Sequence, residues 1–160
     1  MATDRVTNPT DIAPCRVVLD SNVWIDILVF DDPASRPIAV ALESGRLQAV
    51  IDARCLAELT YVLDYPQFAA RSIDKAQALA RVARLTECRV PEPVAAVPAV
   101  PLPKCKDRDD QKFLELAHAS GATWLVSKDR ALLKLARRTA RDFGFRIGPP
   151  ASLNEACGLT

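Results

Sequence analysis

Three aspartates crowd the stretch KDRDDQKFLELA at residues 106–117, immediately before an apolar helical pattern. At 100° per residue, Asp110 lies about 60° from Phe113, near the middle of the apolar face of that helix. A carboxylate at this position points toward the protein interior. Asp107 can also cap the helix, with Asp110 as the acid three residues later, which complements the positive helix end. Capping accounts for one or two of the aspartates, not for three.

Two further aspartates, Asp20 and Asp129, end the apolar runs RVVLD and TWLVSKD. In open parallel sheets, ligands bind outside the carboxyl ends of the strands, so these side chains are expected to face a site. Each can equally cap the helix that follows it. Glu58 lies at the border between the buried and exposed faces of its expected helix. Taken together, Asp20, Glu58, Asp110 and Asp129 can converge on one pocket.

Several carboxylates in one pocket repel one another, and a hard divalent cation removes that repulsion. Mg²⁺ and Mn²⁺ prefer such oxygen ligands, whereas zinc is not favoured because no histidine or cysteine is expected beside the acids. We therefore expect Asp107 or Asp109 to cap the helix and Asp110 to face the metal. A bound cation lowers the pKa of a coordinated water and stabilises charge on a phosphodiester, with two metals as one option. The favoured reaction class is phosphodiester hydrolysis.

The elements expected to position these acids alternate along the chain. Apolar, β-branched runs predict strands at 16–20, 48–52 and 123–129, with an edge strand at 145–148. Helical spacing predicts helices at 22–30, 34–45, 53–65, 72–87, 109–121, 130–144 and 152–158. Because each parallel crossover needs a helix, the pattern predicts a three-layer α/β/α sandwich with a mainly parallel sheet.

Glycine, serine and proline residues refine the expected boundaries of these elements. Gly45, Gly121 and Gly144 stand where helix C-caps are expected, and Ser72 and Ser152 can act as N-caps. The segment 91–103 contains five prolines in thirteen residues and is expected to run extended, across the surface or as an edge strand.

The chain of 160 residues is expected to form one domain over residues 15–160, after a disordered lead at 1–14. Its five cysteines are odd in number and form no C-x-x-C pair, which favours a reducing cytoplasm over a secreted scaffold. No stretch approaches the roughly 20 apolar residues of a membrane span. We therefore expect a cytoplasmic protein with no membrane partner.

Positive charge is concentrated near the C-terminus. Residues 101–160 hold 11 lysines and arginines against 7 acids, although the net charge of the whole chain is only +1. A solvated helix face is the simple explanation. These bases can also contact the phosphates of a nucleic acid. The candidate phosphate-binding residues are Lys112, Arg130, Lys134, Arg137 and Arg138.

The order of the segments VVLDSNVW, LAELTYVL and DRDDQKFLELAHASGATWLVSKDRALL resembles the PIN-domain family of metal-dependent ribonucleases. The resemblance covers residues 16–156 and is strongest for the bacterial branch described as toxin components of toxin–antitoxin systems. It implies that the four family acids fall on Asp20, Glu58, Asp110 and Asp129. It also implies supporting roles for Ser21, Asn22 and Ser127, while Asp107 and Asp109 leave the third metal ligand open.

The resemblance further implies a sheet of about five parallel strands, dependence on Mg²⁺ or Mn²⁺, and endonucleolytic cleavage of single-stranded RNA. Family members are frequently homodimers, and a toxin implies a neutralising antitoxin protein. One alternative is a nucleic-acid-binding or partner-binding module with the same fold but little catalysis. Another is a phosphatase that uses Asp20 as a covalent nucleophile. Asp26, on the first helix, has no role in any of these interpretations and is expected to face solvent.

Overall fold

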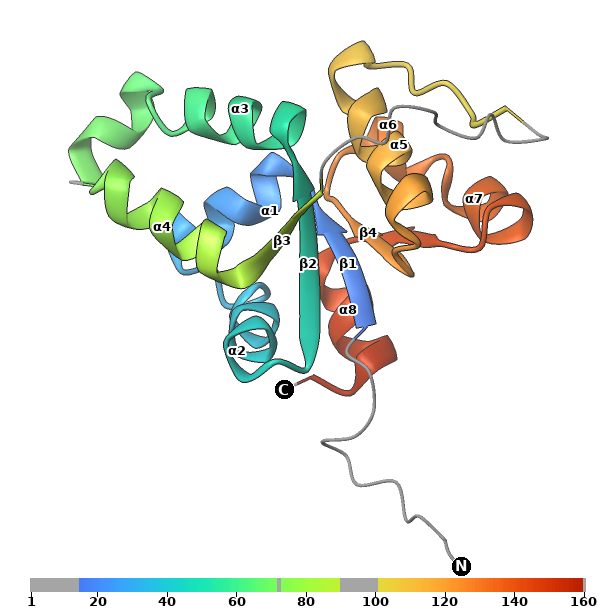
Figure 1. Cartoon of the computed structure of the whole chain (residues 1–160), viewed down its shortest axis with the longest axis horizontal. Helices are drawn as coiled ribbons and strands as arrows, with labels where there is room; N and C mark the ends of the chain where they lie inside the picture. Colours follow the sequence, from blue (N-terminus) through green and yellow to red (C-terminus); the bar gives the residue numbers. More distant parts are fainter. Residues whose placement is uncertain (1–14, 72, 90–100, 160) are drawn as a thin grey trace, which may run out of the picture.

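A parallel five-stranded sheet forms the centre of the structure, a computed structural model that describes residues 15–71, 73–89 and 101–159. The strand order is β3-β2-β1-β4-β5, which places β1 in the middle (Figure 1). All four neighbouring pairs of strands are parallel. The strands are β1 (Cys15–Leu19), β2 (Leu47–Asp52), β3 (Thr86–Arg89), β4 (Trp124–Val126) and β5 (Arg146–Gly148).

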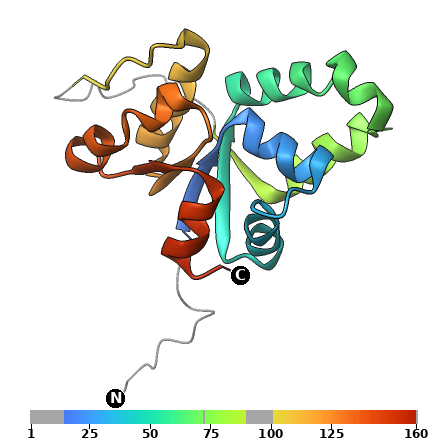
Figure 2. The ribbon, with the colours of Figure 1, turned by 180° about the vertical axis from the view of Figure 1, so that it is seen from behind.

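Helices cover both faces of this sheet. Helix α5 contacts β1, β2 and β4 on the face turned to the viewer in Figure 1, whereas α1 and α8 lie on the opposite face in Figure 2. The predicted three-layer α/β/α sandwich is confirmed. The helices are α1 (Ser21–Ile25), α2 (Arg36–Ser44), α3 (Ala53–Val62), α4 (Lys75–Leu85), α5 (Gln111–Ser120), α6 (Arg130–Leu133), α7 (Ala136–Asp142) and α8 (Pro150–Cys157). A π-helical turn η2 (Asp26–Phe30) and two 3-10 turns, η3 (Pro66–Arg71) and η4 (Arg108–Asp110), complete the set.

The core lies along the central strands. Val17, Val18 and Leu19 of β1 are at most 2% exposed, and Leu125 of β4 is completely buried. Strands that are covered on both faces require such continuous apolar runs. The carboxyl ends of β1 and β4 are held together by a hydrogen bond from the Asp20 backbone N–H to the carbonyl of Val126. This bond places the residues after both strands at one edge of the sheet.

Aspartates begin several of the helices. The side chains of Asp20, Asp52, Asp74 and Asp129 each accept a hydrogen bond from a backbone N–H in the first turn of the following helix. Such bonds satisfy donors that have no partner inside the helix. At the other ends, the predicted C-caps Gly45 and Gly121 adopt φ values of 83° and 70°. Only glycine takes these left-handed conformations without strain.

Three predicted elements differ from the structure. The helix predicted at 72–87 ends at Leu85, and the following residues form β3, which pairs with β2 at the edge of the sheet. The helix predicted at 130–144 is divided into α6 and α7. Ser152 is not an N-cap, because α8 begins at Pro150 with Pro149 at the capping position. Proline fits a first helical position because its missing N–H would have no partner there.

Some predictions concern residues that lie outside the described ranges. These are the lead at 1–14, the proposed cap Ser72 and most of the proline-rich segment 91–103. Its last part, residues 101–103, forms neither a helix nor a strand. Within the described ranges, no helix combines the length and the apolar character needed to cross a membrane.

Replacing Leu125 by alanine should lower the free energy of unfolding by about 2–5 kcal/mol, because the side chain is completely buried in the central part of the sheet. The matched control is Val40→Ala on α2, where the side chain is 63% exposed and the change should be within about 0.5 kcal/mol. Urea unfolding of both variants measures the difference. Equal stabilities would contradict the assignment of Leu125 to the core.

Candidate metal centre

Asp20 follows the central strand β1 and is 3% exposed. Its Oδ1 accepts a hydrogen bond of 3.0 Å from the backbone N–H of Val23, so the residue caps α1. Its Oδ2 accepts a hydrogen bond from the hydroxyl of Ser127, which follows β4. Burial raises the pKa of Asp20 to about 6, although both hydrogen bonds act to lower it. Asp20 is therefore both a helix cap and a strand-end carboxylate.

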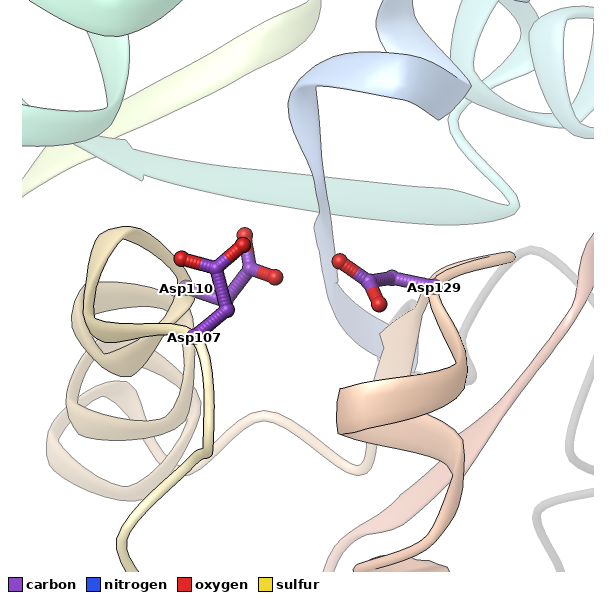
Figure 3. Close-up of side chains that lie close together, drawn as sticks. All are labelled: Asp107, Asp110 and Asp129. Carbon is purple, nitrogen blue, oxygen red and sulfur yellow. The ribbon is translucent and has the colours of Figure 1, made fainter.

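Three other carboxylates meet beside β4. Asp107, Asp110 and Asp129 each place an oxygen within 4.8 Å of the oxygens of the other two. In Figure 3, Asp107 and Asp110 lie on one side, at η4, and Asp129 faces them from the start of α6. Asp107 accepts a hydrogen bond from the N–H of Asp109, and Asp129 accepts one from the N–H of Ala131. We call Asp107, Asp110 and Asp129 the carboxylate cluster.

Asp110 is the least satisfied acid of the carboxylate cluster. Its Oδ2 is buried and has no hydrogen-bond donor among the described residues when the group is ionised. Burial, and then the nearby Asp129, raise the pKa of Asp110 to about 8. The same proton, donated by Asp110, lowers the pKa of Asp129. These opposite pKa shifts are the ones expected for two carboxyls at short distance, because like charges disfavour ionisation of both.

Ser127 connects the carboxylate cluster to Asp20. Its hydroxyl donates to Asp20 Oδ2 and accepts a hydrogen bond of 2.9 Å from the backbone N–H of Asp129. The side chain is completely buried, and its backbone N–H donates to the carbonyl of Gly148 at the end of β5. A hydroxyl that both donates and accepts fixes the relative positions of its two partners. The supporting role expected for Ser127 stays a prediction.

Glu58 lies near the carboxylate cluster but is not one of its members. Its Oε2 accepts a hydrogen bond from the hydroxyl of Ser21, and its Oε1 accepts one of 2.7 Å from Lys112. The Lys112 side chain is only 16% exposed in this ion pair. Glu58 is therefore bound to the residue that directly follows Asp20, and its negative charge is balanced by a lysine.

The remaining candidate residues are exposed. Asn22, the residue after Ser21, is exposed, as is Asp109 between two acids of the carboxylate cluster. Arg130 directly follows Asp129 and is exposed on α6. The other bases predicted to bind phosphates are Lys134, Arg137 and Arg138, which follow along α6 and α7.

Two buried aspartates were not among the predicted site residues. Asp52, at the end of β2, accepts hydrogen bonds from the backbone N–H of Cys55 and from Arg54. Asp26 is 7% exposed, so the expectation that it faces solvent is wrong. Asp26 is the only charged residue in NVWIDILVF, but it lies four positions after the exposed Asn22, so helix periodicity did not indicate its burial.

Oxygen ligands dominate the centre, and the buried, unpartnered Oδ2 of Asp110 fits a hard divalent cation. One cysteine, Cys105, is close enough for the carboxylate cluster to affect it, which the sequence did not predict. Burial, together with the charges of these acids, raises the pKa of the Cys105 thiol. Fold and site together define an α/β/α protein with a carboxylate centre suited to a divalent metal.

The family model of the PIN domain matches residues 16–131, which include Asp20, Glu58, Asp110 and Asp129. The chain therefore belongs to the PIN-domain family. Proteins of this family are generally nucleases that use divalent metals, and the domain is associated with RNA binding. No curated protein and no solved structure matched the chain in the corresponding searches.

Binding of Mn²⁺ should release a proton near neutral pH. With a pKa raised to about 8, Asp110 is protonated at lower pH and must lose that proton to bind a cation. Titration calorimetry in buffers of different ionisation enthalpy should show a release of about one proton per cation near pH 6.5, falling toward zero above about pH 9.

Two variants test the assignment of this proton to Asp110. Asp110→Asn should bind Mn²⁺ more weakly and lose most of the release. Asp109→Asn changes the exposed neighbouring aspartate and should retain both the binding and the release. A release that is independent of pH, or that disappears only in Asp109→Asn, would contradict the assignment.

Proposed function

We propose that this protein is a divalent-metal-dependent endoribonuclease that cleaves single-stranded RNA. The observation that carries the proposal is the meeting of Asp110 and Asp129, with a buried oxygen that has no donor among the described residues, beside the buried Asp20. Structural capping explains Asp129 and Asp20 but not Asp110, whose side chain makes no capping hydrogen bond. Membership of a family of metal-dependent nucleases supports the same reaction.

Asp20, Glu58, Asp110 and Asp129 are the proposed catalytic acids, with Asp107 as an additional candidate ligand. A bound Mg²⁺ or Mn²⁺ would supply an activated water and stabilise the negative charge that develops on the scissile phosphate. Ser127 orients Asp20 and Asp129 through its two hydrogen bonds. Glu58 is oriented by Ser21 and Lys112, so its carboxylate points to the same edge of the sheet.

The bases that follow Asp129 are proposed to hold the RNA backbone. Arg130, Lys134, Arg137 and Arg138 lie on α6, on α7 or between them, and affinity for RNA that does not depend on sequence comes mainly from such residues. Lys112 differs from them because it is largely buried and pairs with Glu58. Its proposed contact with RNA therefore requires exchange of that ion pair for a phosphate.

The biological role proposed is that of the toxin in a cytoplasmic toxin–antitoxin pair, with a homodimer as the active form. This part rests on the resemblance to the bacterial toxin branch of the family. A neighbouring gene for a small DNA-binding protein would support it. A phosphatase that uses Asp20 as nucleophile is not proposed, because membership of the PIN-domain family supports a metal-dependent nuclease instead.

Purified protein should cut a labelled single-stranded RNA with Mn²⁺ or Mg²⁺ but not with EDTA. Asp20→Asn and Asp110→Asn should each lower the rate by roughly 100-fold or more, because a catalytic metal contributes several kcal/mol to transition-state stabilisation. The matched control is Glu43→Gln, an exposed acid that pairs with Arg81 and Arg84 on α4. Equal cutting by all preparations would indicate a contaminant. Metal-dependent RNA binding without any cutting would support the binding-module alternative.

Replacing Arg137 and Arg138 together by glutamine should weaken RNA binding and flatten its dependence on salt. For a single strand, each phosphate that the protein no longer neutralises should reduce the slope of log K against log salt by about 0.7. Fluorescence anisotropy in EDTA measures binding without cleavage. Arg46→Gln, at the opposite end of the sheet before β2, is the control and should leave the slope unchanged. An unchanged slope in the double variant would remove these arginines from the proposed RNA path.

A further inference from the structure

The turn between β4 and α6 carries Asp129 and is held by a separate partner at each of three consecutive residues. Ser127 donates to Asp20, and Asp129 caps α6 through the N–H of Ala131. Between them, Lys128 forms an ion pair with Oδ2 of Asp26. The first two contacts belong to the centre described above, whereas the third has no assigned role.

Asp26 is an unusual partner for an otherwise exposed lysine. Its side chain is 10% exposed, whereas that of Lys128 is 48% exposed. The contact is an ion pair without regular hydrogen-bond geometry, since Oδ2 accepts no directed hydrogen bond from the described residues. A buried carboxylate without a countercharge destabilises a fold strongly. The ion pair with Asp26 therefore fixes the position of the Lys128 ammonium and, with it, the position of the turn between β4 and α6.

The position of Asp26 is itself fixed by the backbone. Its N–H donates to carbonyls of α1, and its carbonyl accepts hydrogen bonds from the N–H groups of Asp31 and Asp32, which close the π-helical turn η2. Short π-helical turns are often found at functional sites. Asp20 and Asp26 thus stand at the two ends of α1 and hold the neighbouring residues Ser127 and Lys128.

We propose that Asp26 is a positioning residue for the metal centre and acts through Lys128 on the turn that carries Asp129. This inference rests on the proposed function of the centre. Helix α6 has only four residues, so its cap and the hydrogen bond from the Asp129 N–H to Ser127 are short local contacts. The ion pair adds a contact to a different element, η2, and helps to keep the Asp129 carboxylate aimed at Asp110. Partners that orient metal ligands typically change metal affinity or activity by about 10- to 100-fold.

A purely electrostatic effect of the two charges makes a different prediction. Without the positive charge of Lys128, a nearby cation would bind more tightly, whereas without the negative charge of Asp26 it would bind more weakly. If the ion pair positions the turn, losing either partner weakens binding. The direction in which the cation affinity changes when Lys128 is lost therefore distinguishes the two explanations.

The experiment measures Mn²⁺ affinity by titration calorimetry, with RNA absent. Lys128→Met and Asp26→Asn should each weaken binding by about tenfold. Lys128→Arg keeps the positive charge and should recover most of the affinity. Lys75→Met is the matched control, because Lys75 forms an ion pair with the exposed Asp64 away from the centre, and it should leave the affinity unchanged.

Urea unfolding of each variant separates positioning from loss of the fold. Lys128→Met leaves the buried Asp26 carboxylate without its countercharge, whereas Asp26→Asn leaves only a half-exposed lysine. Asp26→Asn therefore tests the inference if Lys128→Met fails to fold, and unchanged Mn²⁺ binding in folded Asp26→Asn would overturn the positioning role. Tighter or unchanged Mn²⁺ binding in folded Lys128→Met would overturn the positioning role and leave the proposed nuclease intact. Failure of the unsubstituted protein to bind Mn²⁺ would instead overturn the proposed metal centre and, with it, the role given to Asp26.

Discussion

The loss of water around negatively charged carboxylates is the constraint on which this structure depends. Asp20 and Asp52 are almost fully buried at the ends of adjacent strands, and the carboxylate cluster lies beside them. The chain offsets this cost mainly with backbone N–H groups at helix starts, and further with the hydroxyl of Ser127. Within the carboxylate cluster, Asp110 is the acid whose buried oxygen lacks a donor among the described residues. The unsatisfied group coincides with the place where a cation fits.

Balancing charges also connect the two sides of the centre. Lys112 on α5 pairs with Glu58 on α3, and Arg54 on α3 pairs with Glu115 on α5. The two ion pairs have opposite polarity, so each helix supplies one base and one acid. They hold α3 and α5 at a fixed separation beside the ends of the strands. The position of the Glu58 side chain thus depends on both α3 and α5 and not on α3 alone.

The sequence predicted the parts of the fold that local chemistry decides. Buried runs that end in aspartate identified β1, β2 and β4, and glycine identified the ends of α2 and α5. Strand β3 was missed because its residues are mostly polar and continue a helical pattern, while its pairing with β2 depends on distant residues. In the candidate site, helix periodicity correctly predicted that the Asp110 side chain faces the protein interior. The burial of Asp26 and the Glu58–Lys112 pair depend on neighbours far away in the sequence, which periodicity does not reveal.

The central place of β1 has a consequence for how the protein is made. Strand β1 emerges first from the ribosome among the described elements, but its partner β4 and the residues that meet Asp20 follow more than a hundred positions later. Asp20 and Asp129 therefore cannot approach each other until synthesis has passed residue 129. Such distant pairings also form late because closing long loops is entropically costly. A nascent or truncated chain would thus lack the assembled centre, and synthesis itself would delay the appearance of any RNA-cleaving activity.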